Sequence, residues 1–227
     1  MSTALVVVGG DALDPRAVTQ WLEHHTDSTI VIAADSGYDH AVAAGLQVHI
    51  VVGDLDSISP DGRARLHADT IEVETHPTDK DFTDTELALR AAASRGVERI
   101  TVLGGGGDRL DHSLGALFAL ADPSLAHIAV EAWWGEAHIV VLQGPATRTV
   151  AGRAGEVISL LPVGGPAHGL TTRGVQYALD DDTLHPTASR GVSNVLTDDR
   201  AHITVRSGAL LVVRPHALRP LDKEMTS

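Results

Sequence analysis

The stretch His49-Ile50-Val51-Val52-Gly53-Asp54-Leu55-Asp56-Ser57 joins a short apolar run to a turn with two carboxylates. The apolar run, residues 49–52, predicts a buried strand of a parallel sheet. Asp54 and Asp56 stand at positions i and i+2. An extended turn would place both side chains on one face, where they can share a cation. The alternative is a polar turn whose Asp and Ser side chains bond to local amides.

The same pattern recurs through the first half of the chain. Further strands are predicted over Ala4–Val8, Thr29–Ala33, Thr70–Glu74, Arg99–Leu103 and His127–Ala132. A helical segment is expected from Asp14-Pro15 to about His25. This alternation of strands and helices predicts an α/β domain with a parallel, Rossmann-like sheet covered by helices. The acidic and glycine-rich clusters mostly follow the strands' carboxyl ends, where open α/β sheets bind ligands.

The second half has a different sequence pattern, with short strand-like runs broken by Gly and Pro. These runs are Ile139–Leu142, Glu156–Leu161, Leu170–Arg173, His202–Arg206 and Ala209–Val213. Ser207-Gly208, between the last two runs, predicts a hairpin. We therefore expect a smaller, all-β C-terminal domain. The boundary is placed near Gly144-Pro145, giving domains of residues 1–143 and 144–227.

Composition and charge exclude several classes of function. The formal net charge is −13, and no basic stripe offsets it, so we expect no nucleic-acid binding. The same charge would repel a bare polyphosphate and favours a metal-bound nucleotide. The chain has no cysteine, which excludes disulfides and thiolate metal sites. The segment Met1–Leu5 resembles neither a signal peptide nor a membrane span, so we expect a cytoplasmic protein.

A second acidic cluster is Lys80-Asp81-Phe82-Thr83-Asp84. The overlapping segment Thr83-Asp84-Thr85-Glu86 matches a capping box, with Thr83 as the N-cap of a helix and Glu86 three residues later. Capping accounts for Thr83 and Glu86, and the helix macrodipole favours Asp84. It does not account for Lys80 or Asp81, which stay candidates for ligand binding.

A third cluster follows the predicted strand that ends at Leu103. Its sequence is Gly104-Gly105-Gly106-Gly107-Asp108-Arg109-Leu110-Asp111-His112. Glycines such as Gly105 and Gly106 let backbone amides approach a phosphate at a helix start, and Arg109 could hold phosphate oxygens with two donors. Asp111 could bind metal or orient Arg109. The segment lacks the Walker A and G-x-G-x-x-G patterns, and the alternative is a flexible turn with a surface ion pair.

Two segments of the second half are further candidates. Tyr177 could stack on a planar heterocycle or pack across strands. Ser193-Asn194 could form an ordinary turn or offer polar groups to a small ligand.

In their order and spacing, these segments resemble the motifs of the thiamine pyrophosphokinase family over nearly the whole chain. Its Asp-x-Gly, Gly-Asp-x-Asp-Ser, Asp-x-Thr-Asp and Arg-x-Asp-His motifs are similar to Asp35-Ser36-Gly37, Gly53–Ser57, Asp81–Asp84 and Arg109–His112. Its β-domain landmarks are similar to Leu161–Gly164, Gly174–Tyr177 and Ser193-Asn194.

The resemblance implies an α/β catalytic domain followed by a β-sandwich, and transfer of a pyrophosphoryl group from ATP to thiamine. It also implies a homodimer with thiamine bound between subunits. Asp54, Asp56 and Asp84 would hold magnesium and, with Asp111, carry catalysis. Residues expected to bind ATP or thiamine are Asp35, Ser57, Lys80, Asp81, Thr83, Gly105, Gly106, Arg109, Tyr177, Ser193 and Asn194.

The chain departs from the family pattern at two positions. Asp108 stands where the family usually has glycine, and Ala116 stands where it often has asparagine. Three other functions therefore stay open. They are a pyrophosphokinase for another hydroxymethyl heterocycle such as a pterin, a non-catalytic sensor of nucleotide or thiamine, and a metal-dependent phosphohydrolase.

Overall fold

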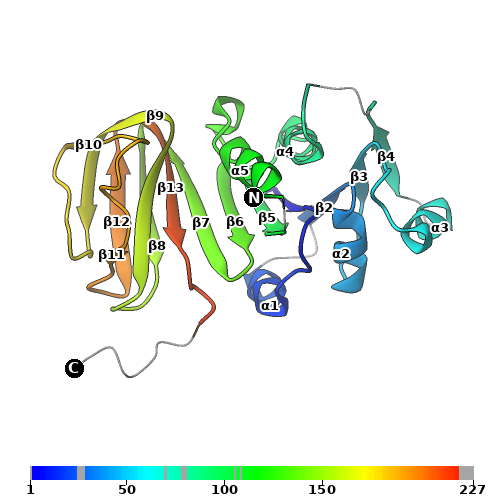
Figure 1. Cartoon of the computed structure of the whole chain (residues 1–227), viewed down its shortest axis with the longest axis horizontal. Helices are drawn as coiled ribbons and strands as arrows, with labels where there is room; N and C mark the ends of the chain where they lie inside the picture. Colours follow the sequence, from blue (N-terminus) through cyan, green and yellow to red (C-terminus); the bar gives the residue numbers. More distant parts are fainter. Residues whose placement is uncertain are drawn as a thin grey trace. The chain divides into compact units, whose positions relative to one another are not determined.

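The computed structural model describes residues 2–24, 29–68, 71–77, 81–104, 106–107 and 109–219 (Figure 1). The chain divides into two compact units, Met1–Gly135 and Glu136–Ser227. Strand β7, Ala137–Gln143, belongs to the second unit, although the sequence suggested a boundary after residue 143. No helix in the described ranges is long and apolar enough to cross a membrane.

The first unit is a mixed α/β fold built on a parallel sheet. Its strands are β1 Thr3–Val7, β2 Thr29–Ala34, β3 Ile50–Gly53, β4 Glu72–Thr75, β5 Arg99–Gly104 and β6 Ala129–Trp134. They lie in the order β4-β3-β2-β1-β5-β6, and every neighbouring pair is parallel. The six strands predicted from the first half are therefore present, with their ends shifted by at most two residues.

The strand order reverses between β1 and β5. From β1 the chain adds β2, β3 and β4 on one side, and then returns to place β5 and β6 on the other. Such a switch point leaves a crevice at the strands' carboxyl ends, which is the usual ligand site of open α/β sheets. The loops that follow β1 and β5 flank this crevice.

Helices cover both faces of this sheet (Figure 1). They are α1 Pro15–His24, α2 Gly37–Ala43, α3 Pro60–Ala68, α4 Asp84–Ser94 and α5 Leu110–Ala119, with a short 3₁₀ turn over Pro123–Leu125. In Figure 1, α1 and α2 lie on one side of the sheet, and α4 and α5 lie on the other. Central strands are accordingly apolar on both faces, as in β1, where Leu5, Val6 and Val7 are fully buried.

The second unit is antiparallel throughout its described strand pairs. Beside β7 it contains β8 Ala146–Ala151, β9 Val157–Arg173, β10 Asp182–Leu184, β11 Asn194–Val195, β12 Arg200–Val205 and β13 Ser207–Arg214. The main strand order is β7-β13-β9-β12-β8, and β10 and β11 also pair with β9. Its apolar core includes Ile158, Leu160, Leu170, Ile203 and Leu210, all buried.

Two sequence predictions for this unit are wrong. The runs Glu156–Leu161 and Leu170–Arg173 belong to one strand, because β9 continues through the glycines between them. Gly164 and Gly169 have φ values of +73° and +66°, so they bend the strand at positions where other residues would be strained.

The predicted hairpin at Ser207-Gly208 is also wrong. β12 pairs with β8 and the end of β9, whereas β13 pairs with β7 and mainly the beginning of β9. The turn carries the chain from one partner strand to another. Both strands pair with the long strand β9 rather than with each other. A local turn motif cannot show that β9 is the partner.

Candidate active site

A cavity of about 400 Å³ lies at the carboxyl ends of the first unit's strands. Its lining comes from the segments that follow β1, β2, β3 and β5, from the last residue of β6, from the first turn of α4 and from the first two turns of α5. These are the segments in which the sequence concentrates its aspartates and glycines, so the cavity is acidic on one side and rich in glycine on the other.

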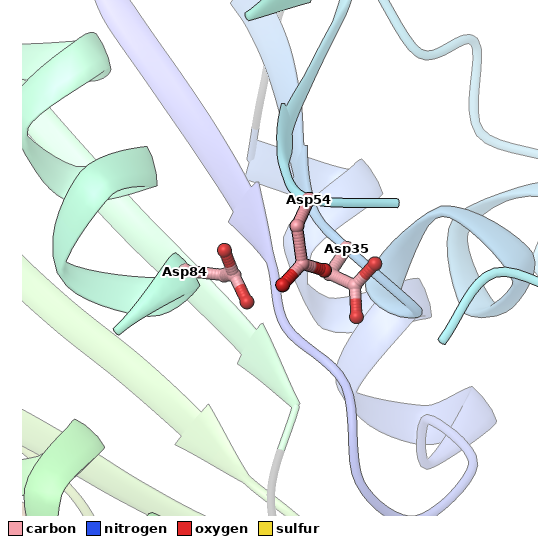
Figure 2. A group of neighbouring side chains, drawn as sticks. All are labelled: Asp35, Asp54 and Asp84. Carbon is pink, nitrogen blue, oxygen red and sulfur yellow. The ribbon is translucent and has the colours of Figure 1, made fainter. Parts of the chain in front are cut away.

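Three carboxylates meet in this cavity: Asp35, Asp54 and Asp84 (Figure 2). One oxygen of each lies within 4.8 Å of the others. Asp35 and Asp54 follow the neighbouring strands β2 and β3, and Asp84 is the first residue of α4. The adjacent strand ends and the helix start therefore bring together side chains from three separate parts of the chain.

Gly53 makes this approach possible. A Cβ added to Gly53 would lie 2.9 Å from Oδ1 of Asp84 and 3.2 Å from Cβ of Asp35. Its φ of +144° is also one that other residues rarely adopt. The glycine of the Gly-Asp-x-Asp-Ser segment is therefore required by the carboxylate cluster.

Asp35 is the most buried member of the cluster. Its side chain is 7% exposed, and Oδ1 has no hydrogen-bond partner in the described structure. Burial, reinforced by the negative charges of Asp84 and Asp54, raises the pKa of Asp35, while a hydrogen bond from Ser57 opposes the shift. A hard divalent cation such as Mg²⁺ would satisfy the free oxygen and remove the repulsion, so this all-oxygen donor set fits magnesium.

Asp56 does not belong to the three-carboxylate cluster, although it lines the cavity. Asp35 occupies the third place that the sequence gave to Asp56. The reason is Leu55, whose φ of +66° means that the turn is not extended between Asp54 and Asp56. Asp56 instead accepts a hydrogen bond of 2.9 Å from the Ser57 hydroxyl.

Asp111 pairs with Arg109. The guanidinium donates through Nε to Oδ1 at 3.1 Å and through Nη2 to Oδ2 at 2.7 Å. This pairing holds the pKa of the Asp111 carboxyl well below its usual range. Arg109 and His112 line the cavity, and Asp111 is not among the lining residues. The sequence favours Asp111 either as a metal ligand or as a residue that orients Arg109. This geometry matches the second role.

The glycine-rich side of the cavity is formed by two loops in close contact. A Cβ on Gly10, which follows β1, would lie 2.4 Å from the carbonyl oxygen of Gly106. Gly106 and Gly107 have φ values of +87° and +119° and precede α5. A helix start beside exposed backbone amides attracts anions. The sequence interpretation missed Gly9 and Gly10 as lining residues, although a Gly-Gly pair directly after a strand was the available signal.

The predicted capping box at the start of α4 is confirmed. The amide of Glu86 donates to Oγ1 of Thr83 at 3.3 Å, and the amide of Thr83 donates to Oε2 of Glu86 at 2.8 Å. The box fixes the helix start that carries Asp84, and Thr83 also lines the cavity. Asp81 is exposed just before this box. Lys80 and Gly105 lie outside the described residues.

In the second unit, Asn194 is committed to the backbone of Tyr177. Its Oδ1 accepts from the Tyr177 amide at 3.0 Å, and its Nδ2 donates to the Tyr177 carbonyl at 2.9 Å. Asn194 is 4% exposed, whereas Tyr177 is 65% exposed. Ser193, with φ of +57°, donates its amide to the Ser159 hydroxyl. Asn194 thus holds the loop that presents the Tyr177 ring.

Comparisons with known proteins agree with the division into two units. Residues 22–131 match the thiamin pyrophosphokinase catalytic domain, and residues 147–210 match the thiamin pyrophosphokinase vitamin B1 binding domain. The thiamine pyrophosphokinase of Bacillus subtilis (strain 168) is 28% identical over 182 residues, which cover 80% of this chain and 83% of that protein.

Solved structures give the same result. The crystal structure of thiamine pyrophosphokinase from Bacillus subtilis is similar with a TM-score of 0.81 at 26% identity, covering 94% of this chain and 98% of that one. The yeast enzyme shares the fold, with a TM-score of 0.69 at 15% identity and coverage of 93% and 86%. Because each unit matches its own domain of one family, in the same order, the chain belongs to the thiamine pyrophosphokinase family.

Proposed function

We propose that this chain transfers the pyrophosphoryl group of ATP to the hydroxyl of thiamine, producing thiamine diphosphate and AMP. The observation that carries the proposal is the convergence of Asp35, Asp54 and Asp84 in a cavity whose opposite side is lined by glycines and a helix start. This arrangement would combine a cation site with a phosphate site, as an enzyme that acts on a metal-bound nucleotide requires.

The carboxylate cluster would hold magnesium, and Asp56 lines the same cavity. When bound, magnesium would neutralise phosphate oxygens and orient the triphosphate. The carboxylates would in turn keep their fixed spacing, because Gly53 and the capping box at Thr83 define the positions of Asp54 and Asp84.

The remaining contacts to ATP would come from the glycine-rich side. The amides of Gly106 and Gly107 and the first turn of α5 would surround phosphate oxygens, and Arg109 would add a positive charge. In-line attack of the thiamine hydroxyl on the β-phosphorus needs mainly positioning and charge neutralisation. The chain's own residues would supply the positioning, and Arg109 and the loop amides would add to the neutralisation that bound magnesium provides.

The second unit would bind thiamine as a β-sandwich domain, with the Tyr177 ring stacking on the heterocycle. We propose a homodimer with the acceptor between subunits. Exposed apolar side chains on both units support an interface: Tyr177 and Val192 on the second, and Leu110, Leu114 and Phe118, spaced four residues apart along α5, on the first. Light scattering of the purified protein would measure the oligomeric state.

The test is a coupled assay with purified protein, ATP, Mg²⁺ and thiamine, in which AMP and thiamine diphosphate are both quantified. Equal amounts of the two products are expected. Phosphate released without an acceptor would identify a phosphohydrolase. AMP formed only in the presence of a pterin would identify the pterin, rather than thiamine, as the acceptor. Tight binding of thiamine or ATP without AMP formation would identify a sensor.

A further inference from the structure

Arg63, on α3, reaches back to the turn that carries Asp54 and Asp56. Its Nη2 donates to the carbonyl of Asp56 at 2.6 Å, and its Nε donates to the carbonyl of Ile58 at 3.1 Å. One planar guanidinium thus holds two carbonyls that are two residues apart. A lysine ammonium lacks this fixed fork of donors.

The turn needs support from outside itself. Leu55 has φ of +66° and Gly53 has φ of +144°, and the left-handed region is unfavourable for leucine. Such residues persist only where their surroundings hold them in place. Leu55 is therefore a position at which the turn would relax if its external contacts were removed.

The turn's internal hydrogen bonds depend on its own carboxylates, one of which belongs to the proposed cation site. The Asp56 amide donates to Oδ1 of Asp54 at 3.2 Å, and the Ser57 hydroxyl donates to Oδ1 of Asp56 at 2.9 Å. Both bonds end on side-chain carboxylates, and the first uses an oxygen of Asp54, a member of the three-carboxylate cluster. The bonds from Arg63 end on backbone carbonyls instead, so they remain available when the carboxylates coordinate.

The start of α3 is itself fixed, so Arg63 extends from a defined position. The amide and hydroxyl of Ser59 donate to the two carboxylate oxygens of Asp39, at 2.7 and 2.8 Å. A Cβ on Gly62 would lie 2.3 Å from Oδ1 of Asp39, so a larger residue would have to displace the Asp39 carboxylate. Helix α3 is thereby anchored to α2, which carries Asp39.

We propose that Arg63 is a positioning residue for the metal-binding turn, holding Asp54 and Asp56 toward the cavity. The inference rests on the proposed function for its catalytic consequence, and on geometry alone for its effect on cation binding. Among the described residues, Arg63 has no carboxylate partner, so its positive charge also remains directed at this acidic turn.

The experiment compares Arg63→Met and Arg63→Lys with Arg65→Met in the full-length protein. Arg65 lies on the same helix, and its side chain makes no hydrogen bond or ion pair within the described residues, so it is the matched control. Mg²⁺ alone is titrated by calorimetry, hydrogen exchange is followed at the amides of residues 54–58, and kcat and KM for ATP are measured with thiamine.

For Arg63→Met we expect Mg²⁺ affinity and kcat/KM to fall by about 10- to 100-fold, the usual effect of removing a group that supports a metal ligand. Exchange at residues 54–58 should become faster. For Arg63→Lys we expect Mg²⁺ affinity, kcat/KM and exchange rates between those of wild type and Arg63→Met. For Arg65→Met we expect all three to match wild type.

Wild-type Mg²⁺ affinity and amide exchange in Arg63→Met would overturn the inference. If Arg63→Met does not fold, Arg63→Lys decides in the same way. Absence of pyrophosphokinase activity in the wild-type protein would contradict the proposed function. Weaker Mg²⁺ binding by the Arg63 variants would even then support the positioning role of Arg63. The two failures are therefore distinguishable.

Discussion

Among the described residues, each unit buries one carboxylate to the same extent, but only one of the two has positively charged partners. Asp35 in the first unit and Glu156 in the second are both 7% exposed. Glu156 accepts from Nε of Arg153 at 2.5 Å and from Nη1 of Arg214 at 3.0 Å, so both its oxygens are paired. Asp35 has an unpartnered oxygen and two negative neighbours. Burial of a charge therefore indicates a ligand site only where the protein supplies no counter-charge.

The largest effect is expected for Asp84→Asn, which removes one charge from the three-carboxylate cluster. We expect kcat/KM to fall on the order of 10²- to 10³-fold, the scale of losing one group that stabilises transition-state charge. Stability should not decrease, because repulsion within the cluster is relieved. AMP formation and urea unfolding would measure the two effects. Asp61→Asn, on the exposed first turn of α3, is the control, and equal activity of both variants would contradict the metal assignment.

Arg214→Met should produce the reverse pattern in the second unit. Removal of a partner from a buried ion pair should lower the free energy of unfolding by about 3 kcal/mol. Mg²⁺ binding should not change. Arg173→Met removes a pair with Asp180 that is exposed on both sides, and should cost less than about 1 kcal/mol. Equal losses in urea unfolding would show that Glu156 is no better paired than a surface carboxylate.

Gly53→Ala tests whether the spacing of the cluster matters. The new methyl group would displace Asp84, and we expect kcat/KM to fall by about 10²-fold, as for a small misplacement of a catalytic group. Gly45→Ala is the matched control, since Gly45 also has a positive φ, +73°, but an added Cβ would meet nothing within 4 Å. It should cost about 1 kcal/mol of stability without affecting kinetics. Kinetic losses of similar size in both variants would point to backbone strain.

The smallest effect concerns pH. Because the folded state raises the pKa of Asp35, it binds this proton more tightly than the unfolded chain does, and stability falls as pH rises from the usual carboxyl range to the raised pKa. Metal-free Asp35→Asn should therefore be more stable than wild type above that window, and Mg²⁺ should reduce the difference. Urea midpoints across pH, with EDTA or Mg²⁺, would measure this. Parallel curves for the two proteins would contradict it.

Local patterns predicted the strands of the first unit and the acidic turns at their ends. Apolar runs bounded by glycine define strands, and the capping box at Thr83 and Glu86 is likewise a local signal. The pairing within the cluster is not local. It depends on β2 lying beside β3 and on the φ of Leu55, so the sequence favoured Asp56 where the structure brings Asp35 to Asp54 and Asp84.

The second unit was harder to predict for the same reason. Gly164 and Gly169 read as breaks between strands, yet β9 passes through both because its neighbours pair on either side of the bend. Asn194 read as a possible ligand group, and the structure adds that its buried side chain holds the Tyr177 backbone through two hydrogen bonds. Such assignments require knowledge of the segment opposite.

The strand order of the first unit has a consequence for how the protein gains from its ligands. The cavity is assembled from residues between Val8 and Trp134, on segments at the ends of β1, β2, β3, β5 and β6 and at the starts of α4 and α5. A ligand that binds here would contact segments attached to five of the six strands. Its binding would therefore stabilise most of the parallel sheet together, which links protection from heat or proteolysis to the supply of nucleotide and cation.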